Sequence, residues 1–278
     1  MSELSVATTI IEPRKGLINI RFRELWAYRE LFLFFVWRDI KVRYAQSVLG
    51  IGWAVIQPVF SMIVFTVVFG NLAKLESDGQ PYQVFSLAGL TLWSYFSTTL
   101  TDASGSLIKN SNMIQKIYFP RLIVPIASVL GKLVDFFLVL LVLLGLMAYY
   151  GIFPGAEAVV MVPLLVFMTM MAAAGAGMWL SSLAIQYRDI NYGLHFGIQL
   201  LMYAAPVVYP LSYVPVQYRL LYGLNPMVGI IEGFRVSLLR TGPMPWDLIA
   251  LSFVVSVALL ASGATYFRNK ERVFADVV

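Results

Sequence analysis

Six long runs of apolar residues dominate this chain of 278 residues. The hydrocarbon core of a bilayer is about 30 Å thick, so a helix that spans it needs about 20 predominantly apolar residues. The runs cover about 50–72, 82–104, 121–150, 157–185, 193–212 and 247–267. The second run is more polar than the others, and the third is long enough to tilt. Because backbone groups in lipid must be paired internally, we predict an all-α integral membrane protein with six transmembrane helices.

The composition is not that of a water-soluble protein. Hydrophobic residues make up 59% of the chain and charged residues 13%, whereas soluble domains average about 45–50% and about 25%. The chain has no cysteine and a single histidine, His195. These counts exclude disulfides and cysteine nucleophiles, and they argue against a histidine-built metal centre.

The basic residues predict the orientation in the membrane. An even number of spans puts both termini on one side, and most of the 20 Lys and Arg residues fall on that side. The positive-inside rule therefore makes both termini cytoplasmic. A net charge of +5 that clusters at the edges of apolar runs indicates a membrane surface rather than nucleic acid. The sequence does not start with a basic segment followed by a short apolar stretch, so we expect no cleaved signal peptide.

The segments outside the spans complete the predicted domain organisation. Residues 1–23 form a cytoplasmic tail, 24–43 an interfacial amphipathic helix, 44–268 a single transmembrane domain and 269–278 a C-terminal cytoplasmic tail. The interfacial helix carries aromatic residues beside a basic cluster, as expected for a helix lying in the headgroup plane. Residues 106–118 and 184–192 are predicted cytoplasmic segments. Residues 213–245 are apolar but broken by Pro and Gly, which favours short re-entrant helices between spans five and six.

The chain lacks a recognisable site for ATP. The phosphate-binding pattern G-x-x-x-x-G-K-[ST] fails twice at the only Gly-Lys pair, where Ile126 and Leu133 replace the first Gly and the hydroxyl residue. An ATP-driven activity would therefore need another chain. Two acid–base pairs with helical spacing, Lys132 with Asp135 and Glu232 with Arg235, are either functional or mutually neutralising, and we favour neutralisation.

Small residues mark places where helices can approach closely. Gly193 and Gly197 form one GxxxG pattern, Gly229 and Gly233 form another, and 172–177 reads AAAGAG. Such patterns pack helices within a subunit or between two copies. The sequence leaves these two possibilities open.

Five motifs in order resemble a known family. They are RYAQSVLGIGW at 43–53 followed by QP at 57–58, KIYFPR at 116–121, YRDI at 187–190, PVVYP at 206–210 and LNPM at 224–227. In this order the chain resembles the membrane subunit of ABC-2 type polysaccharide exporters over about residues 24–270. O-antigen permeases are the nearest members, and capsule and teichoic acid permeases are close relatives. Tyr187 departs from the pattern, since many relatives have Phe before Arg-Asp.

The resemblance implies an assembly and a cargo. Two copies of the chain would form the pore as a homodimer in the bacterial inner membrane, and two copies of a separate ABC ATPase would bind ATP and Mg²⁺. This chain would be a transport subunit without enzymatic activity or a cofactor of its own. Its cargo would be a lipid-linked polysaccharide on a carrier such as undecaprenyl diphosphate, moved out of the cytoplasm.

The resemblance also suggests roles for individual residues. Arg38, Lys41 and Arg43 would contact the lipid diphosphate headgroup, where each cation contributes about 1 kcal/mol. Trp53, Trp93 and Tyr95 would line the pore as aromatic surfaces for sugar rings. The residues that would couple the ATPase to the pore are Lys109, Ile114, Lys116, Ile117, Arg188 and Asp189.

Other functions fit parts of the sequence. An ABC-2 exporter could instead carry teichoic acid, capsule, a drug or a small lipid. A membrane-embedded glycosyltransferase would need a pair of carboxylates at the interface, where only Glu30 and Asp39 lie near each other among basic residues. A structural scaffold for a larger assembly is the third alternative. It predicts unchanged export in any variant that still inserts into the membrane.

Overall fold

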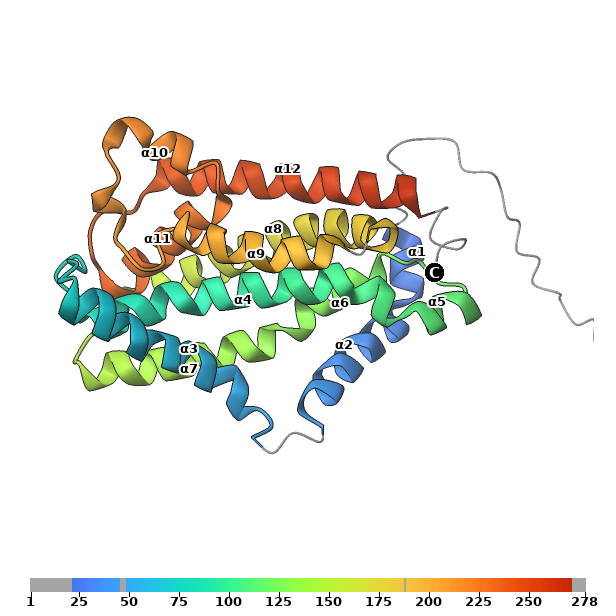
Figure 1. The fold of residues 1–278 in the computed structure, drawn as a ribbon, viewed down its shortest axis with the longest axis horizontal. Helices are drawn as coiled ribbons and strands as arrows, with labels where there is room; N and C mark the ends of the chain where they lie inside the picture. Colours follow the sequence, from blue (N-terminus) through green and yellow to red (C-terminus); the bar gives the residue numbers. More distant parts are fainter. Residues whose placement is uncertain (1–21, 46–48, 188, 272–278) are drawn as a thin grey trace, which may run out of the picture.

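Every regular element in residues 22–45, 49–187 and 189–271, the ranges that this computed structural model describes, is helical. The helices form an elongated bundle with α4, α8 and α12 along its length (Figure 1). In chain order they are α1 (Phe22–Ala27), α2 (Arg29–Tyr44), α3 (Gly52–Phe65), η1 (Thr66–Leu72), α4 (Tyr82–Lys109), α5 (Ser111–Lys116), α6 (Ile123–Gly131), α7 (Leu133–Tyr149), α8 (Ala158–Gln186), α9 (Asp189–Tyr203), η2 (Leu211–Tyr213), α10 (Val216–Tyr222), α11 (Pro226–Leu239) and α12 (Trp246–Lys270). The predicted all-α fold class is confirmed.

Four helical segments in the described part of the chain are long and apolar enough to cross a membrane. They are Gly52–Leu72, Ile123–Tyr149, Ala158–Gln186 and Trp246–Lys270. The first joins α3 to the π-helical η1, and the second joins α6 to α7 through a break at Lys132. They correspond to four of the six apolar runs.

The helices at the other two runs differ from these four. Helix α4 covers the second run but carries many hydroxyl residues, and most of its side chains are buried against α3, α6, α7, α8, α9 and α11. A helix surrounded by protein does not need the apolar surface that lipid demands. Helix α9 ends at Tyr203, well before the predicted end of the fifth run, and Pro206 and Pro210 lie in the irregular segment that follows.

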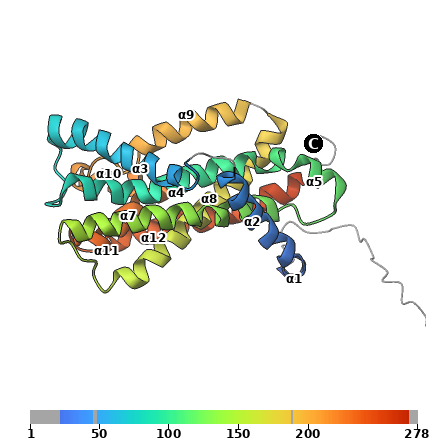
Figure 2. The same ribbon diagram turned by 90° about the horizontal axis from the view of Figure 1, so that it is seen from below.

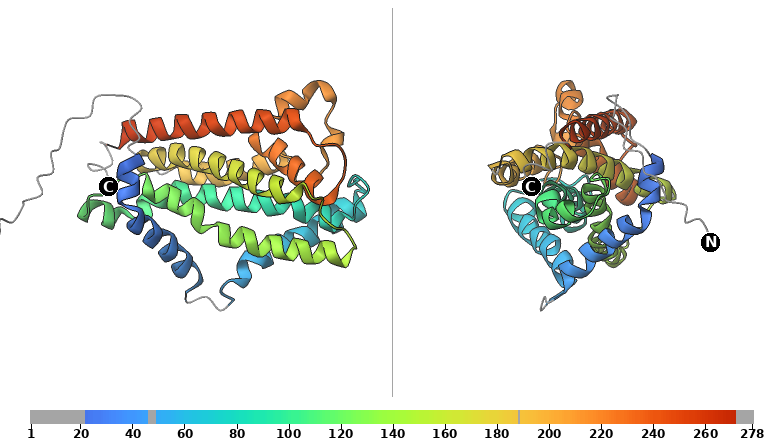
Figure 3. Two further views of the ribbon diagram at one scale, coloured as in Figure 1. Left: turned by 180° about the vertical axis from the view of Figure 1, so that it is seen from behind. Right: turned by 90° about the vertical axis from the view of Figure 1, so that its right-hand side faces the viewer.

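The interfacial segment contacts the bundle more closely than a helix lying only in lipid. It forms two helices, with Tyr28 between α1 and α2, and α2 packs against α6. Phe35 is buried, whereas Phe34 and Trp37 on other faces are exposed. Apolar side chains therefore lie on both the packed and the exposed faces of α2, beside exposed charged residues such as Arg29 and Lys41. Figure 3 shows α2 and α12 on opposite sides of the bundle.

Glycines allow the closest helix crossings. A Cβ atom on Gly263 would collide with the backbone of Gly175 where α12 crosses α8, and one on Gly229 would collide with the backbone of Leu248 where α11 meets α12. The second GxxxG pattern therefore packs within the subunit. A Cβ atom on Gly193 would meet nothing within 4 Å, and α9 lies at the edge of the bundle (Figure 2).

The region between α9 and α12 forms the end of the bundle opposite α5 (Figure 1). Helix α11 starts at Pro226, and the side chain of Asn225 accepts a hydrogen bond from the Met227 amide at 3.1 Å. An Asn N-cap followed by Pro at the first position is a favourable helix start. Every residue of α11 is buried. The predicted short helices in 213–245 are thus present as α10 and α11.

Candidate functional site

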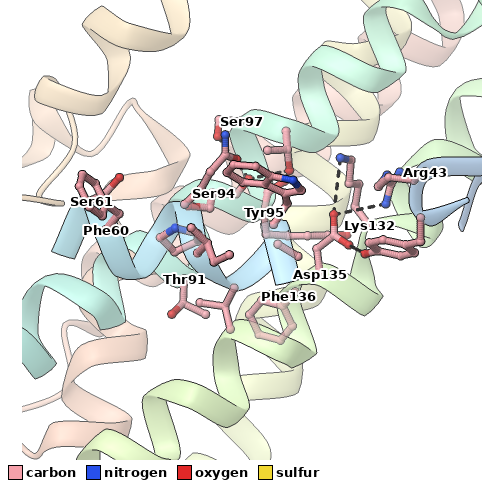
Figure 4. A pocket seen from close by; sticks show the side chains of 18 of the residues that line it. Arg43, Phe60, Ser61, Thr91, Ser94, Tyr95, Ser97, Lys132, Asp135 and Phe136 are labelled. Atoms are coloured by element: carbon pink, nitrogen blue, oxygen red, sulfur yellow. Dashed lines mark hydrogen bonds and ion pairs between the residues drawn. The ribbon is translucent and has the colours of Figure 1, made fainter. Parts of the chain in front are cut away.

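A cavity of about 730 Å³ opens between the end of α2, α3, α4 and the first turns of α7 (Figure 4). Its volume lies within the range of about 300–1,000 Å³ that is typical of small-molecule sites. The lining residues are Arg43, Tyr44, Gly50, Trp53, Ala54, Ile56, Gln57, Pro58, Phe60, Ser61, Thr91, Ser94, Tyr95, Ser97, Thr98, Lys132, Asp135, Phe136 and Val139. The cavity combines hydroxyl, aromatic and charged side chains.

Helix α4 contributes a row of hydroxyl groups to the cavity. Thr91, Ser94 and Thr98 recur about one helical turn apart, so they share one face of the helix. The Thr98 hydroxyl donates to the carbonyl of Ser94 at 2.7 Å, and the Thr91 hydroxyl donates to that of Leu87 at 2.7 Å. These bonds use the protons and leave the hydroxyl oxygens able to accept from a polar ligand.

Two cations and two carboxylates form a closed ring beside the cavity, which Arg43, Lys132 and Asp135 line. The Arg43 guanidinium lies 3.1 Å from the Asp102 carboxylate and 3.3 Å from that of Asp135. The Lys132 ammonium lies 3.1 Å and 3.5 Å from the same two carboxylates. The break between α6 and α7 brings Lys132 to this point. Each cation is therefore shared between both acids, and the ring carries no formal net charge.

Tyr44 holds the ring to the end of α2. Its hydroxyl donates a hydrogen bond to the Asp135 carboxylate. Burial, followed by the hydrogen bond and charge of Asp135, raises the pKa of Tyr44 to about 12. The hydroxyl thus keeps its proton at physiological pH. Arg43 also donates to the carbonyl of Gly131 at 3.3 Å, so α2 is attached to the bundle by two consecutive side chains.

The three predicted headgroup cations have different surroundings. Arg43 lines the cavity. Arg38 donates to the side chains of Asp39 at 2.8 Å and Asn110 at 2.6 Å, away from the cavity lining. Lys41 is exposed, and its ammonium lies 4.8 Å from the centre of the Trp37 ring. The structure therefore brings only Arg43 of the three into the cavity.

The three predicted pore aromatics do not all line the cavity. Trp53 and Tyr95 line the cavity, and the Tyr95 hydroxyl donates to the carbonyl of Val129 at 3.1 Å. Trp93 is buried in the core, where its ring lies 5.7 Å from that of Phe96. Trp93 does not contribute to this cavity.

The predicted coupling residues gather at the end of the bundle near α5. Lys109, Lys116 and Ile117 are exposed. Ile114 instead points inward, into an apolar cluster with Phe35 and others at this end. Asp189 starts α9 and is exposed, and Arg188 lies outside the described residues.

Sequence reasoning missed half of the ionic ring. It recognised Lys132 and Asp135 as a local pair but assigned Arg43 to the lipid headgroup, and it gave Asp102 and Tyr44 no role. The helical spacing of Thr91, Thr98 and Asp102 was the available signal, since these residues lie near one face of α4. That spacing does not reveal which cations face them.

Comparison with known proteins identifies the family. Residues 30–239 match the family described as ABC-2 type transporter. The chain belongs to this family. It is 29% identical over 259 residues to an O-antigen export system permease protein of Myxococcus xanthus, a match that covers 92% of this chain and 98% of the relative.

Two further relatives of this ABC-2 transporter chain carry similar descriptions. An O-antigen export system permease protein of Klebsiella pneumoniae is 26% identical over 241 residues, which is 87% of this chain and 92% of the relative. A polysialic acid transport protein of Escherichia coli is 23% identical over 247 residues, covering 84% and 91%. The predicted resemblance to ABC-2 membrane subunits is thus confirmed.

Proposed function

We propose that this chain is the permease subunit of an ATP-driven exporter that moves lipid-linked polysaccharide of the O-antigen type out of the cytoplasm. The observation that carries the proposal is the similarity to O-antigen export permeases over nearly the whole length of both chains. The cavity supports it chemically. Hydroxyl oxygens on α4 can accept from sugar hydroxyls, and the half-exposed Trp53 ring offers a flat surface for a sugar face.

The proposed topology has six spans, with both termini in the cytoplasm of a bacterium. Helices α4 and α9 are the two additional spans, and α10 and α11 are re-entrant helices at the outer end. The burial of α11 on all sides supports this assignment, because non-spanning backbone at membrane depth must be shielded by protein.

The proposed assembly contains two copies of this chain and two copies of an ABC ATPase that binds ATP and Mg²⁺. Helix α5 is the coupling helix that the ATPase would contact. The exposed side chains of Lys109, Lys116 and Ile117 at and beside α5 support this role, because an Ile exposed at 52% near two cations suits a partner's apolar cleft with an acidic rim.

The diphosphate of the lipid carrier is proposed to approach Arg43 beside the cavity, with the exposed Lys41 on the same helix adding to the local positive potential. Such a position would leave the carrier's hydrocarbon chain in the bilayer and the first sugars in the cavity. Trp53 and the hydroxyl row of α4 would then lie next to those sugars.

Reconstitution tests the proposal. The chain and its partner ATPase are placed in vesicles together with a fluorescent lipid-linked glycan, and translocation is measured as loss of access to an added glycosidase. We expect ATP-dependent translocation that requires both subunits. The variant Ser97→Trp, which fills the cavity, should abolish it, whereas Val254→Trp on an exposed face of α12 should not. ATP-dependent movement by the permease alone would refute the proposal.

A further inference from the structure

A hydrogen bond connects α2 to the junction between α4 and α5. Asn110 is the one residue between these two helices, since it follows the last residue of α4 and precedes the first residue of α5. Its buried side chain accepts a hydrogen bond from the Arg38 guanidinium at 2.6 Å and donates one to the Ser106 carbonyl of α4 at 2.7 Å. Arg38 of α2 therefore holds the residue at which α5 begins.

The Arg38 guanidinium is fixed in this position by two further contacts. It donates to the Asp39 carboxylate at 2.8 Å, and it lies 4.7 Å from the centre of the Phe35 ring. Hydrogen bonds from a charged donor are stronger than those between neutral groups. Phe35 in turn belongs to the same buried apolar cluster as Ile114 of α5. Helix α5 is thus connected to α2 by a polar contact and by an apolar one.

The last turn of α2 makes the second set of contacts. Arg43 contacts the carboxylates of Asp102 and Asp135, and Tyr44 donates to that of Asp135, in the ionic ring beside the cavity. Helix α2 contains neither Pro nor Gly between Arg38 and this turn. Since sharp kinks in helices arise mostly at such residues, this part of α2 should move as one rigid piece. A displacement of α2 therefore changes the contacts of the ring.

Helix α2 can move with less loss of packing than α4, which offers the other route from α5 to the cavity. Most side chains of α4 are buried against other helices. In α2 only Phe35 and Asp39 are buried. Displacing a helix costs the buried contacts that it breaks, because the interior of a protein is closely packed. A small force applied at α5 should therefore shift α2 before it shifts α4.

We propose that Arg38 is a positioning residue that passes a displacement of α5 on to α2, and through Arg43 to the ionic ring beside the cavity. The inference rests on the proposed function, because it takes α5 as the helix that the ATPase contacts. Coupling between distant sites is carried by packed side chains and hydrogen bonds that join rigid elements. The contacts at both ends of this part of α2 form such a connection.

Transport and ATP hydrolysis, measured together, test this role. Vesicles contain the permease, its ATPase and a fluorescent lipid-linked glycan. Arg38→Met should reduce the glycan translocated per ATP hydrolysed about tenfold, which lies within the usual range of coupling effects. Asn110→Leu should reduce this ratio similarly, and the double variant no further, because both substitutions remove the same bond. Arg29→Met, which removes an exposed cation from the same helix, should leave the ratio unchanged.

Distances between spin labels distinguish transmission from simple destabilisation. The chain contains no cysteine, so introduced cysteines can be labelled selectively. Asn112 of α5, Val42 of α2 and Leu141 of α7 are exposed and suit this purpose. Trapping the ATPase with ATP and vanadate should change the distances from Leu141 to both Asn112 and Val42. In Arg38→Met only the distance to Asn112 should still change.

The possible outcomes separate the inference from the proposed function. An unchanged transport ratio in Arg38→Met, additive losses in the double variant, or an unaltered change in the distance from Val42 to Leu141 would each overturn the inference alone. If Arg38→Met does not fold, Asn110→Leu carries the same measurements. Absence of ATP-dependent glycan transport by the natural protein with its ATPase would instead overturn the proposed function.

Discussion

Replacing Arg235 with methionine should strongly destabilise the end of the bundle that contains α11 and the segment after α9. Arg235 on α11 is only 1% exposed. Its guanidinium donates to the carbonyls of Phe85 at 3.2 Å, Val207 at 2.6 Å and Pro206, and it lies 3.7 Å from the centre of the Phe85 ring. Two of these carbonyls belong to the irregular segment after α9. One side chain therefore supplies hydrogen-bond donors to backbone carbonyls that are not part of a helix.

The size of the effect follows from what the substitution leaves behind. Methionine fills much of the volume but donates nothing, so three carbonyls lose charged donors worth about 1.5–3 kcal/mol each, and these losses are not additive. Glu232, 3.9 Å from Arg235, also becomes an uncompensated buried charge. Breaking a buried pair on one side costs about 3–5 kcal/mol. We expect a loss of about 4 kcal/mol in the free energy of unfolding.

Unfolding of the purified protein by sodium dodecyl sulfate in mixed micelles measures this loss. Arg240→Met is the matched control, because Arg240 caps the same helix but is exposed and donates to the Pro154 carbonyl at 3.2 Å; it should cost less than about 1 kcal/mol. The double variant Glu232→Gln/Arg235→Met should recover about 2 kcal/mol, since no buried charge remains unpaired. Equal unfolding of Arg235→Met and Arg240→Met would refute the reasoning.

Two other predictions concern packing and coupling. Gly263→Val should lower the free energy of unfolding by about 1–3 kcal/mol, because the added side chain forces α12 away from Gly175. Gly145→Ala is the control, since a Cβ atom there meets nothing within 4 Å, and it should not lower the free energy of unfolding. The same unfolding assay checks both variants, and equal effects would contradict the close crossing. Ile117→Asp should leave the permease folded but reduce transport-linked ATP hydrolysis about tenfold by weakening one docked apolar contact. Ile114→Asp should instead lower thermal stability, because the Ile114 side chain is buried. Normal coupled turnover in a folded Ile117→Asp variant would argue against α5 as the contact with the ATPase.

The ionic ring shows most clearly where sequence reasoning stopped. The pair Lys132 and Asp135 could be found because a helix brings residues three apart together. Arg43 lies 59 residues from Asp102 and 92 from Asp135 in the chain, and no local spacing connects them. The same limit explains why Ile114 was predicted to be a contact residue: its side chain lies in an apolar cluster with Phe35 of α2, and no local spacing connects these two residues.

The sequence by itself determined that this chain is helical and built for a membrane, because run length and composition respond directly to bilayer thickness and to the cost of unpaired backbone in lipid. Its ordered motifs also indicated the family. Only the tertiary structure decided which helices lie inside the bundle and which charges meet. Those outcomes depend on contacts between distant segments, which apolar periodicity does not encode. For that reason α4 could look like a poor span while forming the wall of the cavity.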